Sequence, residues 1–484
     1  MTEVSEVVPW ILAAAVGFAV LMLLRTRTTL MGWTLLFVFN AASASLAAFV
    51  FGRVAGLDEA WITPYHADVF WYSAWAVLAM VAAMWLAWRP LMDRSRVPEG
   101  ARNFNSDSLR WVNSRFVYLS LLLGLVASVL YLFVVRVPTL GTVVASFSAW
   151  TKVAVILAAI HWRVGRGSTP LVVSLCVYGP LSLIFSVTSG FSPISTDLAI
   201  PLVLVVAGFR KFNLMSLMKA GASTVILANL MFAWMASRGA IRKGELEQYS
   251  ISVRIEKLLG LMADNLSWSN MNAYSVQSLL LERIDMSDLL ALQARHQPAI
   301  EPFRWGGTVV DGAFALVPRV LWPSKPRVAG GSEFVSRYTG VPRLESDETS
   351  VGVPVQLELY ANGGPLWVIA GLFLFVYSCA RLERMVIVET QPLHVLLPSI
   401  LVLMAFGSGV QQIMLVLTST LAGAGGIYFL ARFIEKSAPK LRSRLLGEAR
   451  PKAHSTWSAL QGKPGVAAAR LSGQIRATTG GQGQ

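Results

Sequence analysis

The sequence is short of charge and nearly free of cysteine. Asp, Glu, Lys and Arg make up 14% of its 484 residues, whereas hydrophobic residues make up 55%. Ordinary soluble domains are roughly 25% charged, so this composition argues against that class and predicts a polytopic membrane protein. The two cysteines, Cys176 and Cys379, lie in separate apolar runs, which argues against a disulfide framework or a zinc site.

Several motifs of known chemistry are also missing from the sequence. The five histidines show no metal-ligand spacing, and there is no Walker A motif and no GxSxG. Zinc spacings, aromatic ladders and recognition helices, which would indicate nucleic-acid binding, are absent as well. Nothing therefore predicts a cofactor or a nucleic-acid partner. The acidic start MTEVSEVVPW is not followed by a small-residue cleavage site, which predicts a retained first span and not a signal peptide.

Long apolar runs recur along the whole chain. A run of about 18 or more residues is enough to cross the roughly 30 Å of hydrocarbon in a bilayer. These runs predict an all-α membrane protein with about eleven spans, the last two of which could instead form a re-entrant pair around residues 407–409. The predicted spans are residues 7–24, 29–51, 69–88, 116–135, 143–160, 170–189, 194–209, 220–236, 365–380, 392–409 and 411–432.

Lys and Arg are unequally divided between the short loops on the two sides of the predicted spans. One side holds little beyond Arg53 and Arg136. Because cytoplasmic loops carry an excess of Lys and Arg, we expect the N-terminus outside and the C-terminus in the cytoplasm. The predicted cytoplasmic loops hold Arg25, Arg27, Arg89, Arg94, Arg96, Arg102, Arg110, Arg115, Arg163, Arg166, Arg210, Lys211, Lys219, Arg381 and Arg384.

The order of spans and loops divides the chain into four parts. We expect an N-terminal bundle of about eight spans at 1–236, an extracytoplasmic helical loop at 237–364, transmembrane helices at 365–433 and a cytoplasmic tail at 434–484. Ten of the 41 Lys/Arg residues, but only two of the 27 acidic ones, lie from Arg432 onward. This tail, rich in Gly, Ser and Ala, has the composition of a disordered segment attracted to anionic lipid.

The loop at 237–364 is nearly neutral, with 13 Lys/Arg and 14 Asp/Glu. Ten of its cations are arginines, which suits discrete ion pairs or anion contacts better than a lipid-binding patch. Helical periodicity predicts a small helical cap on the outer face of the bundle. Its helices are ISVRIEKLLGLM (251–262), with an apolar stripe suited to the membrane interface, SDLLALQAR (287–295), with Ser287 as N-cap and Pro298 beyond its end, and VVDGAFALV (309–317).

The stretch VPRVLWPSKP, Val317 to Pro326, follows the last of these helices. Its three prolines prevent a regular helix or a central strand. Arginine forks and lysine charges suit phosphate oxygens, so Arg319, Lys325 and Arg327 on this stiff backbone would form a preorganised site for a pyrophosphate. Alternatively, these cations form salt bridges to carboxylates of the same loop, namely Glu333, Glu345, Asp347 or Glu348.

Three further residues have both a functional and a structural interpretation. Glu358, at the mouth of the ninth predicted span, could act as general base toward a sugar hydroxyl, or it could pair with an arginine and lock the loop. Tyr360 could stack on a sugar ring or belong to an interfacial aromatic belt. Lys152, inside a predicted span, either meets an anionic substrate in a polar cavity or snorkels to an interface.

Residues 316–364 resemble a known family. The runs LVPRVLWPSKP, GGSEFVSRYTG and ETSVGVPVQLELYANGG are similar to the C-terminal signature of Wzy-type oligosaccharide repeat unit polymerases, which make O-antigen and exopolysaccharide. That signature has a PR-aromatic-WP-x-KP run and then E-x-Y-x-N-aromatic-G at the start of a span. This chain departs from it at Gly363, where an aromatic residue is common. The many-span topology with one large outer loop is also similar.

The resemblance implies a GT-C-like fold in the bacterial plasma membrane, with the active site on the extracytoplasmic face. The growing glycan would pass from undecaprenyl pyrophosphate to the next lipid-linked repeat unit, without a metal or a nucleotide sugar. A chain-length regulator and a flippase would be partners. Glu358 would be the base, and Arg319 and Lys325 would bind the donor pyrophosphate. The further substrate-binding residues would be Arg327, Arg337, Arg304, Trp322, Tyr360, Asn362 and Lys152.

Two other functions fit the same topology. An O-antigen ligase-like transferase would attach finished chains to another acceptor. A transporter or flippase for lipid-linked oligosaccharide is the third alternative, although such proteins often show internal repeats and this sequence shows no convincing one.

Overall fold

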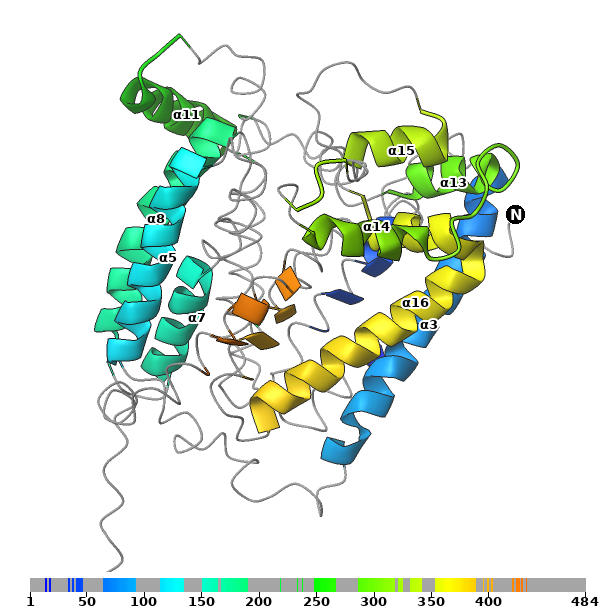
Figure 1. Ribbon diagram of the computed structural model, residues 1–484, viewed down its shortest axis with the longest axis horizontal. Helices are drawn as coiled ribbons and strands as arrows, with labels where there is room; N and C mark the ends of the chain where they lie inside the picture. Colours follow the sequence, from blue (N-terminus) through cyan, green and yellow to red (C-terminus); the bar gives the residue numbers. More distant parts are fainter. Residues whose placement is uncertain are drawn as a thin grey trace, which may run out of the picture.

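The computed structural model describes residues 64–92, 114–134, 150–163, 167–189, 248–266, 286–317, 321–324, 331–341 and 353–388. It also describes isolated positions between 14 and 46, between 218 and 237, and between 395 and 432. Within these residues the chain forms nine helices and no strand, so the described part is all-α as predicted (Figure 1).

Two long helices, α3 (Pro64–Met92) and α16 (Val355–Val388), pack side by side and run in the same direction (Figure 1). Near their starts the rings of Tyr72 and Tyr360 are 5.6 Å apart. Near their ends the Arg384 guanidinium donates a hydrogen bond of 3.0 Å to the carbonyl of residue 87. The two helices are therefore parallel neighbours over most of their length.

Both helices contain a stretch that is long and apolar enough to cross a membrane. These stretches are Val69–Pro90 in α3 and Val355–Met385 in α16. Helices also cover the predicted spans at 116–135 and 170–189, and part of the one at 143–160, although their described apolar stretches are shorter. The other predicted spans, at 7–24, 29–51, 194–209, 220–236, 392–409 and 411–432, lie outside the described residues apart from isolated positions.

A second group of helices consists of α5 (Ser114–Val134), α7 (Trp150–Arg163) and α8 (Thr169–Ser189). α7 packs against both α5 and α8. The contact with α5 is very close at Gly124, because a Cβ added there would lie 2.3 Å from the backbone nitrogen of Thr151. A small residue at this crossing lets two apolar helices approach backbone to backbone, as is common between membrane helices.

Four helices come from the predicted outer loop: α11 (Ile251–Leu266), α13 (Ser287–His296), α14 (Gly307–Leu316) and α15 (Gly331–Thr339). Three of the four lie together at the starts of α3 and α16, whereas α11 lies beside α8 (Figure 1). Leu290 of α13 and Phe334 of α15 are buried in the same hydrophobic core as Phe70 of α3 and Leu357 of α16. α13 and α15 are therefore fixed to the two long helices by a shared core.

The predicted helices at 251–262, 287–295 and 309–317 are confirmed as α11, α13 and α14. The prediction of Ser287 as the N-cap of α13 is wrong. Met286 occupies the cap position, and Ser287 is the first helical residue and is buried. The N–H of Met286 donates to the carbonyl of residue 44. The start of α13 is thus set by a contact from a distant part of the chain, which local sequence does not reveal.

Candidate functional site

The candidate site lies where α16 is broken near its start. Gly363 (φ −172°, ψ 27°) and Gly364 (φ 71°, ψ −155°) leave the helical conformation and divide α16 into residues 355–362 and 365–388. The backbone of Gly364 lies in a region that is essentially restricted to glycine. Pro365 then starts the second part, at a helix position where proline needs no N–H partner. The sequence Gly-Gly-Pro thus encodes this feature, which we call the α16 break.

Asn362 joins the α16 break to the start of α14. Its Oδ1 accepts hydrogen bonds from the backbone N–H groups of Gly306 (3.0 Å) and Thr308 (3.3 Å). Its Nδ2 donates to Thr308 Oγ1 (2.6 Å) and to the carbonyl of Glu358 (2.9 Å). These four bonds use the full donor and acceptor capacity of a side-chain amide. Asn362, only 2% exposed, therefore caps α14 from another helix.

Backbone hydrogen bonds reinforce the same contact. The N–H of Arg304 donates to the carbonyl of residue 361 (2.9 Å), and the N–H of Trp305 donates to that of Asn362 (2.8 Å). Carbonyls at the end of a helical segment lack partners within the helix. The backbone N–H groups of residues 304 and 305 supply hydrogen-bond donors to two of these carbonyls. The backbone of 304–308 is thereby fixed directly on the α16 break.

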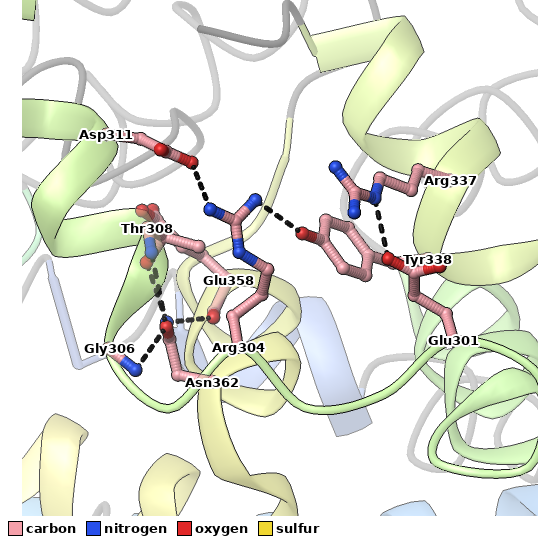
Figure 2. Close-up of polar contacts among 9 residues, drawn as sticks. All are labelled: Glu301, Arg304, Gly306, Thr308, Asp311, Arg337, Tyr338, Glu358 and Asn362. Carbon is pink, nitrogen blue, oxygen red and sulfur yellow. Dashed lines mark hydrogen bonds and ion pairs between the residues drawn. The ribbon is translucent and has the colours of Figure 1, made fainter. Parts of the chain in front are cut away.

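Arg304 projects from this segment between α14 and α15 (Figure 2). One terminal nitrogen lies 3.0 Å from a carboxylate oxygen of Asp311, and the other donates to the Tyr338 hydroxyl at 3.3 Å. Partial burial alone lowers the pKa of the Arg304 guanidinium. The hydrogen bond to Tyr338 and the charge of Asp311 outweigh burial and raise this pKa above its ordinary value. Arg304 is thus a charged side chain held in place between α14 and α15.

Glu358 lies one helical turn before Asn362 and is only 3% exposed. Its backbone carbonyl accepts the Asn362 hydrogen bond, and its side chain extends from α16 toward α14 in Figure 2. We call the set Arg304, Thr308, Asp311, Glu358 and Asn362 the polar junction. It places a buried carboxylate and a guanidinium on two segments that are hydrogen-bonded to each other, where α14 meets a helix long enough to span a membrane.

Other candidate residues lie around or away from the polar junction. Tyr360 is buried, with Phe303 edge-on at 6.0 Å and Tyr72 at 5.6 Å between ring centroids. Arg337 of α15 is exposed and makes a 2.7 Å ion pair with Glu301 (Figure 2). Trp322 packs edge-on against Phe314 of α14 at 5.2 Å.

Lys152 is partly buried in α7, which packs against α5 and α8. Arg319, Lys325 and Arg327 lie outside the described residues, so the predicted proximity of Arg319 to Glu358 stays a prediction. The described arginines of the candidate set, Arg304 and Arg337, both form ion pairs. For Arg319, Lys325 and Arg327 the structural alternative was an ion pair with a carboxylate of the same loop. Arg304 and Arg337 form ion pairs of this kind.

Sequence reasoning missed Asp311, Tyr338 and Thr308 as members or neighbours of the polar junction. A signal was available for Asp311, because it is the single charged residue in the apolar run VVDGAFAL. Among the described residues, no group of three or more His, Cys, Asp or Glu side chains is placed to hold a metal ion.

Comparison with known proteins adds no relative. No family model, no curated protein and no solved structure matches the chain.

Proposed function

We propose that this chain is a membrane-embedded glycosyltransferase that polymerises lipid-linked oligosaccharide repeat units. It would have eleven spans and a GT-C-like fold in the bacterial plasma membrane, with the N-terminus outside and the C-terminus in the cytoplasm. The motif resemblance at residues 316–364 supports this proposal. So does the parallel packing of α3 and α16, because the third and ninth predicted spans would cross the membrane in the same direction.

The observation that carries the proposal is the position of the E-x-Y-x-N segment. Glu358, Tyr360 and Asn362 lie on one short helical segment just before the α16 break, and all three are buried. Asn362 fastens this segment to α14, whose C-terminal end leads directly into VPRVLWPSKP. The segment that carries the buried Glu358 is therefore hydrogen-bonded to α14. α14 ends only a few residues before Arg319 and Lys325.

In the proposed reaction, Glu358 takes the proton of the acceptor hydroxyl as the sugar oxygen attacks the anomeric carbon of the donor glycan. A new glycosidic C–O bond forms, the C–O bond to pyrophosphate breaks, and undecaprenyl pyrophosphate leaves. Arg319 and Lys325, helped by Arg327, would stabilise the charge on the leaving pyrophosphate. Arg304 and Arg337 would supply positive charge beside them. A flippase and a chain-length regulator would be partners of the protein.

The proposal is tested in cells that make the glycan with Glu358→Gln or Arg319→Ala as their only copy of this protein. Both variants should accumulate lipid-linked single repeats, because transfer stops while repeats continue to arrive. The matched controls are Glu256→Gln in α11 and Arg381→Ala in α16, which alter exposed residues elsewhere and should leave chain length unchanged. Polymer of normal length in both test variants would refute the site.

Product analysis separates the two transferase functions. A polymerase extends the chain on its lipid carrier, so loss of the protein leaves single repeats. A ligase moves finished chains, so its loss leaves long chains on the carrier.

A further inference from the structure

Helix α14 exposes its apolar side and turns its polar side inward. Val309 and Val310 are 47% and 50% exposed. Thr308 is buried against Asn362, and Asp311 is held by Arg304. A helix of a soluble protein shows the opposite arrangement, with its apolar stripe facing the core. Apolar surroundings would suit this exposed side of α14.

The exposed apolar side of α14 continues onto α16. Trp305, just before α14, is 73% exposed, and Leu366, at the start of the second part of α16, is 77% exposed. The Trp367 ring lies close to Gly306 at the start of α14, since a Cβ added at Gly306 would lie 3.8 Å from this ring. We call Trp305, Val309, Val310, Leu366 and Trp367 the apolar rim.

The apolar rim also continues along a helix that is long enough to span a membrane. Leu374, two turns beyond Leu366 on α16, is 62% exposed, and both lie in the candidate span Val355–Met385. The two tryptophans stand at the start of this apolar surface, and tryptophan is enriched at the boundary between lipid headgroups and hydrocarbon. The backbone of Trp305 has φ 49°, a left-handed conformation that is unusual for a bulky residue.

We propose that the apolar rim lies in the bilayer, with Val309 and Val310 of α14 facing the acyl chains of lipid. Among possible occupants, hydrocarbon is favoured because the surface carries no charge and is continuous with the exposed face of α16. α14 would lie flat at the interface, as amphipathic interfacial helices do. The Arg304–Asp311 ion pair, whose side chains are 27% and 29% exposed, would then lie at the edge of the acyl chains. This placement goes beyond the proposed reaction and does not depend on sugar chemistry.

Spin-label accessibility in the full-length protein tests this placement. The two native cysteines are replaced by serine, and one nitroxide is attached at Val310→Cys in lipid nanodiscs. Oxygen concentrates in hydrocarbon, whereas a water-soluble nickel chelate stays in water. We expect relaxation at position 310 to be enhanced several-fold more by oxygen than by the chelate. The same label at Glu333→Cys, on the exposed side of α15, should show the reverse.

Spin labels at two further positions, 309 and 374, serve as controls for the measurement at position 310. Val309→Cys repeats the measurement on the same exposed side, in case Val310→Cys does not fold. Leu374→Cys reports on the span itself and should be oxygen-accessible. Chelate accessibility at 309 and 310 with oxygen accessibility at 374 would overturn the apolar rim as a lipid contact. Low accessibility to both reagents at 309 and 310 would also overturn it, because another part of the chain or a second copy would then cover α14.

Discussion

At the scale of single residues, the Asn362 side chain uses its full hydrogen-bonding capacity. Three of its hydrogen bonds hold the start of α14 on the α16 break, and a fourth goes to the carbonyl of Glu358 in its own helix. Asn362→Ala leaves two backbone N–H groups of α14 without this acceptor. Since an unsatisfied buried polar group costs about 1–3 kcal/mol, we expect a loss of about 2–4 kcal/mol, measured as a lower thermal unfolding temperature in detergent.

The matched control is Ser378→Ala, which removes an exposed hydroxyl bound only to the carbonyl of residue 374 of its own helix. It should unfold at the wild-type temperature. An Asn362→Ala protein as stable as this control would show that α14 does not depend on its cap from α16.

Arg304 gives a second prediction at this scale, because its planar fork reaches two partners at once. Lysine has a single ammonium group and cannot reproduce this geometry. Tyr338→Phe removes only the hydroxyl and should cost about 0.5–1.5 kcal/mol. In an Arg304→Lys background the same change should cost almost nothing, since the hydrogen bond is already lost. Thermal unfolding of the four proteins in this double-mutant cycle measures the coupling, and equal losses in both backgrounds would contradict the contact.

At the scale of helices, the α16 break depends on Gly364. An alanine there would have to adopt φ 71° and ψ −155°, and its Cβ would lie 3.0 Å from the Phe303 ring. Backbone strain of this kind costs about 1–3 kcal/mol. We therefore expect Gly364→Ala to lower the unfolding temperature. We also expect it to loosen α14, which would appear as faster hydrogen exchange over residues 304–311.

Gly260→Ala is the matched control for this prediction. Gly260 lies inside α11, and a Cβ there meets nothing within 4 Å. Because alanine is favoured over glycine in a helix by about 0.5–1 kcal/mol, this variant should be equally or more stable. If both glycine variants behave alike, the special conformation of Gly364 has no energetic consequence.

These helices show what the sequence could and could not reveal. The spacing of apolar residues predicted α11, α13 and α14. The Gly-Gly-Pro run placed a predicted span start at 365, where the second part of α16 begins. The role of Asn362 as a cap for α14 was not predictable, because capping motifs in sequence join near neighbours and Asn362 lies 54 residues from Thr308. The pairing of Arg304 with Tyr338 is equally non-local.

At the scale of the whole molecule, two observations predict on which side of the membrane each region lies. They are the unequal distribution of Lys and Arg and the parallel course of α3 and α16. The helices α13–α15 gather at the starts of both long helices (Figure 1), whereas the Lys/Arg-rich tail follows the last predicted span. The proposed topology places these two regions on opposite sides of the membrane.

A membrane-impermeant maleimide, applied to intact cells lacking an outer membrane barrier, tests this placement. In a cysteine-free background, Glu333→Cys on the exposed side of α15 should react at once. Ser455→Cys in the tail should react only after the membrane is permeabilised, because charged reagents do not cross hydrocarbon. Labelling of Ser455→Cys alone would reverse the orientation and place Glu358 on the cytoplasmic side, where an extracytoplasmic polymerase could not use it. Labelling of both in intact cells would mean that the two regions share one side, which the three predicted spans between them do not allow.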